Sequence, residues 1–217
     1  MRAHVAKGSN TAANSVMAIL ATAFAFGALG GTAAAAAPVR DNVATQVAGA
    51  SKTECVEQAA ATQCTSSSLT VRASDATTEA CLEIATYAIS ANEVTGAIVE
   101  SGCGPVSQGA FTFEAKDLSA AALSPTIITL QAFACDAQGC APTGGTKTVV
   151  VAATFTGIGE VSTFRANSKT TFGGCTMYFV GKGSSREAQA RTTIDDRSFD
   201  SPGILATSTQ KFMVICH

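Results

Sequence analysis

Eight cysteines are the residues of this sequence whose type and number point most clearly to a chemistry. They are Cys55, Cys64, Cys81, Cys103, Cys135, Cys140, Cys175 and Cys216. An even number of cysteines in an exported chain is typical of a disulfide framework, which requires an oxidising compartment. The alternative is a zinc site, but there is no Cys-x-x-Cys spacing, and His217 is the only histidine beyond the N-terminal region. We therefore expect disulfide bonds, no bound metal and no cofactor.

One disulfide is suggested by a short loop. Cys135 and Cys140 flank four residues that separate two β-rich runs, namely Asp136, Ala137, Gln138 and Gly139. A turn of this length between antiparallel strands brings the flanking cysteines within reach of a bridge. We predict a Cys135–Cys140 bridge that fixes the shape of the loop. Its role is either turn rigidity or the presentation of a recognition loop.

A second disulfide is suggested by alternation near the C-terminus. Cys175 shares a strand face with Met177 and Phe179, and Cys216 shares one with Phe212. We predict a Cys175–Cys216 bridge that ties the last strand into the sheet. The remaining four cysteines, Cys55, Cys64, Cys81 and Cys103, are expected to pair in an order that the sequence does not fix.

Catalytic side chains are scarce. A nucleophilic triad needs a base, and His217 is the last residue, where chains are poorly ordered unless tied down. The densest carboxylate group is Asp195, Asp196 and Asp200. Adjacent strand residues face opposite ways, so Asp195 and Asp196 could not both face one substrate. We expect a turn there, no catalytic residue, and a calcium candidate at Asp195, Asp196 and Asp200 that matches no established spacing.

Sugar and phosphate sites are not indicated either. The chain has no Trp and only two Tyr, Tyr87 and Tyr178, which argues against an aromatic sugar platform. The segment 181–185 (GKGSS) lacks the Walker spacing and precedes no helix, so we interpret it as a turn.

The elements that would position these residues are short β-rich runs separated by glycine-containing turns. The expected strands are 69–73, 81–89, 94–100, 110–115, 126–135, 147–156, 161–166, 175–181, 186–194 and 211–216. Before them, residues 37–66 form a weakly patterned lead-in, either partly disordered or containing a short helix at 54–63 because Ser51 and Glu54 have capping-box spacing.

This pattern predicts an all-β fold from residue 67 to residue 217. Many short strands without a long helical pattern favour a sandwich or a sheet closed on itself. We expect a disulfide-braced antiparallel β-sandwich, either one larger sandwich or two small ones that divide near residue 157.

The N-terminal segment carries a targeting signal. Arg2, His4 and Lys7 precede an uncharged apolar run over 16–31, and small residues follow. This order is typical of a secretory signal peptide, which we place at residues 1–36. The mature chain is then expected to be extracellular, without a membrane span. The alanine- and glycine-rich composition suggests a bacterial source.

Charge is unevenly distributed along the chain. Residues 38–160 contain five basic and twelve acidic residues, whereas 161–217 contain seven basic and four acidic ones. The basic part is either a set of solvated strand faces or a surface for an anionic partner. The acidic total of the mature chain argues against nucleic acid as a partner.

These observations favour a secreted, non-enzymatic module with a structural or interaction role, whose partner is an extracellular protein or a cell-wall component. The alternatives are a secreted protease inhibitor that presents the 135–140 loop, and an extracellular hydrolase that uses carboxylates alone.

Overall fold

The computed structural model describes residues 39–216 apart from 59–60, 91–92 and 137–138. The secondary structure of these residues consists of β-strands. They contain no helix that is long and apolar enough to cross a membrane. The predicted all-β, antiparallel and disulfide-braced fold is confirmed. The predicted signal peptide at 1–36 and the terminal His217 lie outside the described residues.

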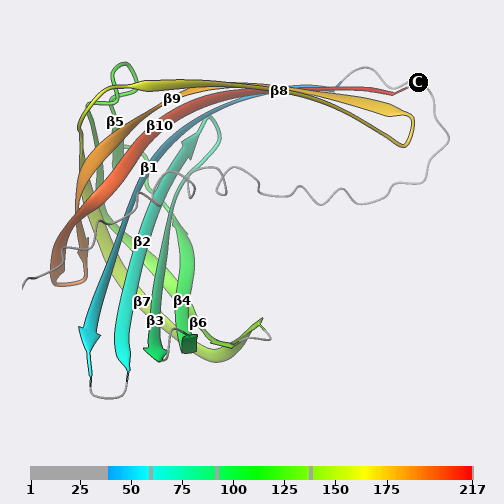
Figure 1. The fold of residues 1–217 in the computed structure, drawn as a ribbon. Coiled ribbons are helices and arrows are strands. Elements are labelled where there is room, and N and C mark those ends of the chain that lie inside the picture. Colours follow the sequence, from blue (N-terminus) through cyan, green and yellow to red (C-terminus); the bar gives the residue numbers. More distant parts are fainter. Residues whose placement is uncertain (1–38, 59–60, 91–92, 137–138, 217) are drawn as a thin grey trace, which may run out of the picture. The chain divides into compact units, whose positions relative to one another are not determined.

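Ten strands follow one another along the chain (Figure 1). Their bounds are β1 (Val39–Glu57), β2 (Thr62–Ser74), β3 (Thr78–Ser90), β4 (Glu93–Pro105), β5 (Phe111–Phe113), β6 (Ala120–Asp136), β7 (Gly139–Gly157), β8 (Ser162–Phe172), β9 (Cys175–Ile194) and β10 (Arg197–Cys216).

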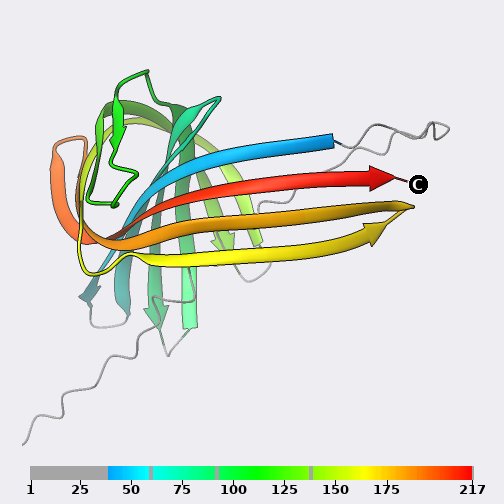
Figure 2. The same ribbon diagram turned by 90° about the horizontal axis from the view of Figure 1, so that it is seen from above.

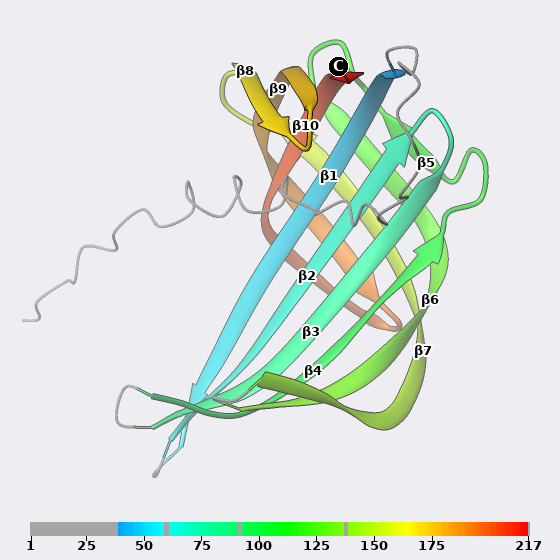
Figure 3. The same ribbon diagram turned by 90° about the vertical axis from the view of Figure 1, so that its right-hand side faces the viewer.

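All ten strands belong to one sheet, which closes on itself. The order is β10-β1-β2-β3-β4-β6-β7-β9-β8, and β5 pairs with β6. Because β9 also pairs with β10, the path returns to its start, and eight strands enclose the core (Figure 3). What the sequence suggested as one or two sandwiches is thus a single continuous sheet.

The core fills the inside of this closed sheet. Alternate residues point inward, as Ile128 and Leu130 do on β6 and Val149 and Val151 on β7. The largest fully buried side chains also include Phe155, Leu69, Leu82, Leu118 and Leu205. Burying each such side chain stabilises the fold by about 1.5–3 kcal/mol.

The same sheet continues beyond the closed part through β1, β9 and β10 and gains β8 there; we call this four-stranded extension the arm (Figures 1 and 2). It consists of β8, residues 175–185 of β9, residues 206–216 of β10 and residues 39–44 of β1. The pairing of β1 with β2 begins only at Thr45, and that of β9 with β7 only at Ala188. The arm is therefore a four-stranded sheet with β8 at one edge and the start of β1 at the other.

The lead-in differs from its prediction. Residues Val39–Glu57 form β1, which pairs with β10 on one side and β2 on the other. The helix considered for 54–63 is absent from the described residues there, because Ser51 and Glu54 lie in β1 and Thr62 begins β2. Strand pairing on both sides outweighs the local capping-box signal, since it satisfies the same backbone groups.

The turn expected at 181–185 is also wrong. β9 runs unbroken from Cys175 to Ile194, so two predicted strands are one. The two glycines are extended and leave room for aromatic rings: a Cβ on Gly181 would lie 2.9 Å from Cζ of Phe179, and one on Gly183 would meet the ring of Phe164. These glycines serve side-chain packing rather than a change of chain direction.

No structural division occurs near residue 157. Residues 36–217 form one compact unit, and β7, which ends at Gly157, pairs with β9. By contrast, turns do occur at Gly173-Gly174, where φ is +56° and +79°, conformations that favour glycine.

Candidate interaction surface

The eight cysteines form four disulfides, and each joins two residues that face each other directly across neighbouring strands. The bridges are Cys55–Cys64, Cys81–Cys103, Cys135–Cys140 and Cys175–Cys216. Both pairs expected from the sequence are among them. In every case the two cysteines are register partners. Each bridge therefore fixes a strand register, because a slip of one residue would turn the two sulfurs to opposite faces.

The disulfides also describe the environment of the chain. In the described residues no cysteine is free, and four bridges indicate an oxidising compartment. Glu79 lies beside Cys81 and Cys103 in the one cluster of potential metal ligands that the described residues contain. Both sulfurs there belong to the bridge, so neither is a thiolate that could hold an ion.

The predicted recognition loop is the hairpin between β6 and β7. Asp136 and Gly139 are register partners beyond the Cys135–Cys140 bridge, and the Gly139 backbone N–H donates to Oδ1 of Asp136 at 3.2 Å. Asp136 and Gly139 are exposed. Ala137 and Gln138, which come between them in the sequence, lie outside the described residues.

The three carboxylates considered for calcium are held separately. Asp195 occupies the turn between β9 and β10, where its Oδ1 accepts a hydrogen bond of 2.9 Å from the Val150 backbone N–H. Asp200 lies on β10, with Oδ1 3.6 Å from Nη1 of Arg191. Asp195, Asp196 and Asp200 do not converge into a shared set of ligands. The Asp195 carboxylate therefore holds the turn against β7.

A shallow depression lies outside the closed part, beside this ion pair. Its volume is about 260 Å³, and it is lined by Thr154, Thr156, Gln189, Ala190, Arg191 and Asp200. It is open to solvent, and its two charged residues already pair with each other. It offers little of the enclosure or the convergent polar groups that small-molecule sites have.

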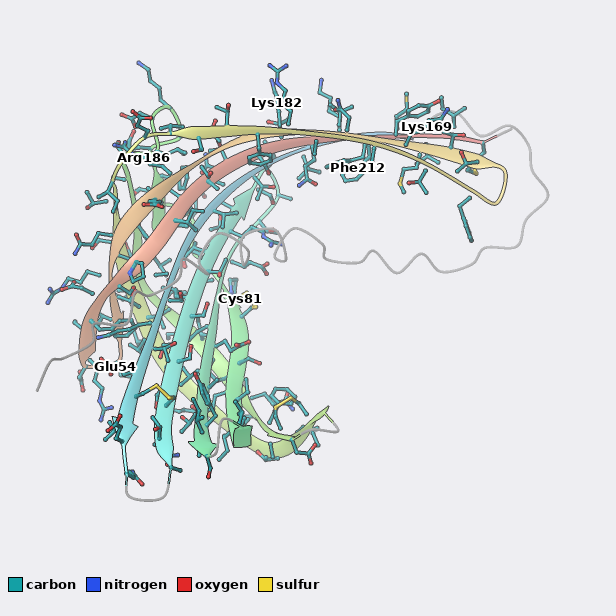
Figure 4. All side chains as sticks on the ribbon, viewed as in Figure 1. Glu54, Cys81, Lys169, Lys182, Arg186 and Phe212 are labelled. Carbon is teal, nitrogen blue, oxygen red and sulfur yellow. A yellow bond between two sulfur atoms is a disulfide. The ribbon has the colours of Figure 1, made fainter. Side chains whose placement is uncertain are left out.

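The arm differs from the rest of the fold because the side chains of β8 are exposed on both of its faces. Its strand register places every residue on one of two faces. One face, which we call the basic face, carries Arg165, Lys169, Lys182 and Lys211. The opposite face, which we call the aromatic face, carries Phe164, Phe172, Met177, Phe179, Phe212 and Val214. In Figure 4, Lys182 and Phe212 project from opposite sides of the arm.

Charge is concentrated on the basic face. All four of its Lys and Arg side chains are exposed. Arg165 of β8 is the direct register partner of Lys182 of β9, and like charges in that position repel each other. Lys169 lies over the ring of Tyr178, with Nζ 5.5 Å from its centroid. The arm thus presents a dense positive surface on a chain whose formal net charge is −2.

Hydrogen bonds fix the end of the arm that joins the closed part. The Arg186 guanidinium donates from Nε to the Gly159 carbonyl and from Nη1 to the Asp117 carbonyl, both at 3.1 Å. These bonds connect β9 to the loop before β8 and to the segment before β6. Hydrogen bonds from the Ser119 side chain and backbone lower the pKa of the Asp117 carboxyl.

The sequence signal for this surface was the excess of basic residues after residue 160. This excess was compatible with solvated strand faces or with a surface for an anionic partner. Four of these basic residues share one face because β8, β9 and β10 run side by side in the arm, with Arg165 opposite Lys182 and Lys169 opposite Tyr178.

Comparison with protein-family models, with curated proteins and with solved structures finds no match for this chain.

Proposed function

We propose that this protein is a secreted, non-enzymatic module that binds an anionic polymer of the cell surface through the basic face of its arm. The observation that carries the proposal is the set of four exposed cations on one face, including the directly opposed Arg165 and Lys182. Repulsion between these two charges disfavours the free arm and is relieved when an anion lies across them.

Several features of the fold support this role. The disulfides suit an extracellular chain. The closed part fixes one end of the arm through β1, β9 and β10, so the cations lie on a preformed sheet. A preformed surface loses less conformational entropy on binding than a flexible basic tail would. The charges lie in a row of neighbouring strands, which suits an extended polymer better than a compact ligand.

The test compares binding to purified cell-wall polymer in a series of salt concentrations. We expect binding that weakens with salt, because exposed charges are screened. Replacing Arg165 and Lys182 by Gln should weaken binding about 30-fold, since each cation near an anionic surface contributes about 1 kcal/mol. The matched control replaces Lys147 and Arg197, which are exposed in the closed part, and should retain binding.

Equal losses in the two double variants would contradict the proposal, because net charge rather than the basic face would then decide binding. Binding that does not respond to salt would contradict it as well.

A second candidate function is protease inhibition by the 135–140 hairpin. The observation in its favour is the Cys135–Cys140 bridge, together with the hydrogen bond between the exposed residues Asp136 and Gly139, which fixes the base of the hairpin. Its test is capture of a protease from culture supernatant. Substitution of Gln138 should abolish that capture, and the Arg165 and Lys182 substitutions should leave it unchanged.

A further inference from the structure

The aromatic face of the arm is an exposed apolar surface that the proposed function does not use. Phe172 is 87% exposed, Met177 39% and Phe164 37%. Among the side chains that the structure describes, none on this face is charged. At the β1 edge, the register position opposite Phe212 belongs to Asp41. Contiguous apolar surface of this kind usually marks an interaction site.

The rings on this face are already arranged as a packing surface. Phe179 and Phe212 are register partners whose ring centroids lie 5.1 Å apart at an interplanar angle of 46°. Phe179 covers Gly181, and Phe164 covers Gly183. The glycines let the rings of Phe179 and Phe164 lie along the strands.

The size of this face matches a stable protein interface. Three strands of about ten residues and the six residues 39–44 of β1, about 4.8 Å apart and rising about 3.3 Å per residue, give a face of about 570 Å². Two such faces packed together bury about 1,100 Å², which exceeds the roughly 1,000 Å² that a specific interface needs.

The distribution of charge favours a second copy over a lipid surface. The cations that would be drawn to anionic headgroups lie on the opposite face of the same strands, so they would point away from a bilayer that covered the aromatic face. In a pair of arms with their aromatic faces in contact, by contrast, both basic faces remain in solvent. The two sets of charges then lie on the outer sides of two sheets that pack about 10 Å apart, and this separation limits the repulsion between them.

We propose that two copies of this chain dimerise by packing the aromatic faces of their arms against each other. The contact is isologous, because the same face serves both partners, and it therefore closes after two copies. The pair of arms becomes a two-layered sandwich whose interior is Phe164, Phe172, Met177, Phe179, Phe212 and Val214. Each outer layer then presents one basic face.

The experiment is sedimentation equilibrium of the oxidised protein over a micromolar concentration series. The unsubstituted chain should approach twice its monomer mass. The variant Phe172→Lys/Met177→Lys places two charges on the aromatic face. Because burying an unpaired charge is costly, it should weaken the dimer by roughly 100-fold. Both residues are partly or largely exposed, so the variant should fold normally.

The matched control is Thr171→Lys/Val180→Lys, which adds the same charge to the basic face of the same two strands. This variant should dimerise like the unsubstituted chain. A monomer at every concentration, or equal loss in the two variants, would overturn the proposal. Assemblies that grow beyond two copies would also overturn it, because they would indicate pairing along the free edges of β8 and β1.

Mixing the chain with vesicles of neutral and anionic phospholipid tests the competing occupant. A monomer that binds vesicles through Phe172 and Met177 would show that lipid covers the aromatic face instead of a second copy, and it would overturn the proposal. The dimer proposal and the polymer-binding proposal can be tested independently. The Phe172 and Met177 variant should still bind wall polymer, and the Arg165 and Lys182 variant should still dimerise.

Discussion

Removing a single disulfide should destabilise the protein more when that disulfide closes a longer stretch of chain. Cys175–Cys216 joins residues 41 positions apart, whereas Cys135–Cys140 joins residues only 5 apart. A bridge stabilises mainly by restricting the unfolded chain, and this effect grows with the logarithm of loop length. The chain-entropy relation gives about 4 kcal/mol for the first bridge and about 2 kcal/mol for the second.

The perturbation is paired replacement by serine, as Cys175→Ser/Cys216→Ser and Cys135→Ser/Cys140→Ser. None of these four cysteines is fully buried, so serine adds little packing cost. Urea unfolding followed by far-UV circular dichroism is the appropriate assay, because the chain has no Trp to report by fluorescence. The Cys175/Cys216 variant should lose about 2 kcal/mol more unfolding free energy than the other.

An equal or larger loss in the Cys135/Cys140 variant would refute this reasoning. It would mean that the short bridge acts on the folded hairpin instead of on the unfolded chain. A second unfolding transition in the Cys175/Cys216 variant would show that the bridge makes the arm unfold together with the closed part. The unfolding of that variant could then not be described by a single free energy.

Five further substitutions at four positions test the core and the turn between β9 and β10, each by urea unfolding. Leu205→Ala should cost about 3 kcal/mol because Leu205 is 0% exposed. Ile127→Ala, at a site that is 65% exposed and lies outside the arm, should stay within about 0.5 kcal/mol of the parent. Similar losses in the two variants would contradict the assigned core. Thr192→Val should be neutral or stabilising by about 1 kcal/mol, because the Thr192 hydroxyl is buried without a hydrogen-bond partner in the described structure; a clear loss would reveal a partner such as a buried water. Asp195→Ala should cost about 0.5–1.5 kcal/mol by removing the acceptor of the exposed Val150 backbone N–H, and Asp195→Asn should recover part of that loss because its amide oxygen can accept the same bond. A loss in the Asn variant equal to that in the Ala variant would indicate that the negative charge matters instead.

Local pattern was sufficient for several features of the fold. The alternation through Cys175, Met177 and Phe179 predicts a strand with one apolar face, and these residues form the first part of β9. The four residues between Cys135 and Cys140 predict a bridged hairpin, which the structure contains. These features depend on neighbours in sequence, so a single chain segment contains the information for them.

Local pattern failed where a distant strand decided the outcome. Residues 39–57 carry little strand signal of their own, yet they form β1 because β10 and β2 offer partners on both sides. Gly181 and Gly183 carry a strong turn signal, yet they stay extended because rings from Phe179 and Phe164 fill the space beside them. In both cases contacts made only in the folded sheet outweigh the local propensity.

Strand alternation and cysteine number are properties of the linear chain, so an all-β chain braced by disulfides could be predicted from the order of residues. Which strand faces are covered is a property of the folded sheet. Alternation says that Phe212 and Lys211 point to opposite sides of a strand, but it cannot say whether another layer lies against either side. Coverage depends on where the sheet closes. The sheet closes before the arm begins, so among the strands that the structure describes none lies over the aromatic face or the basic face.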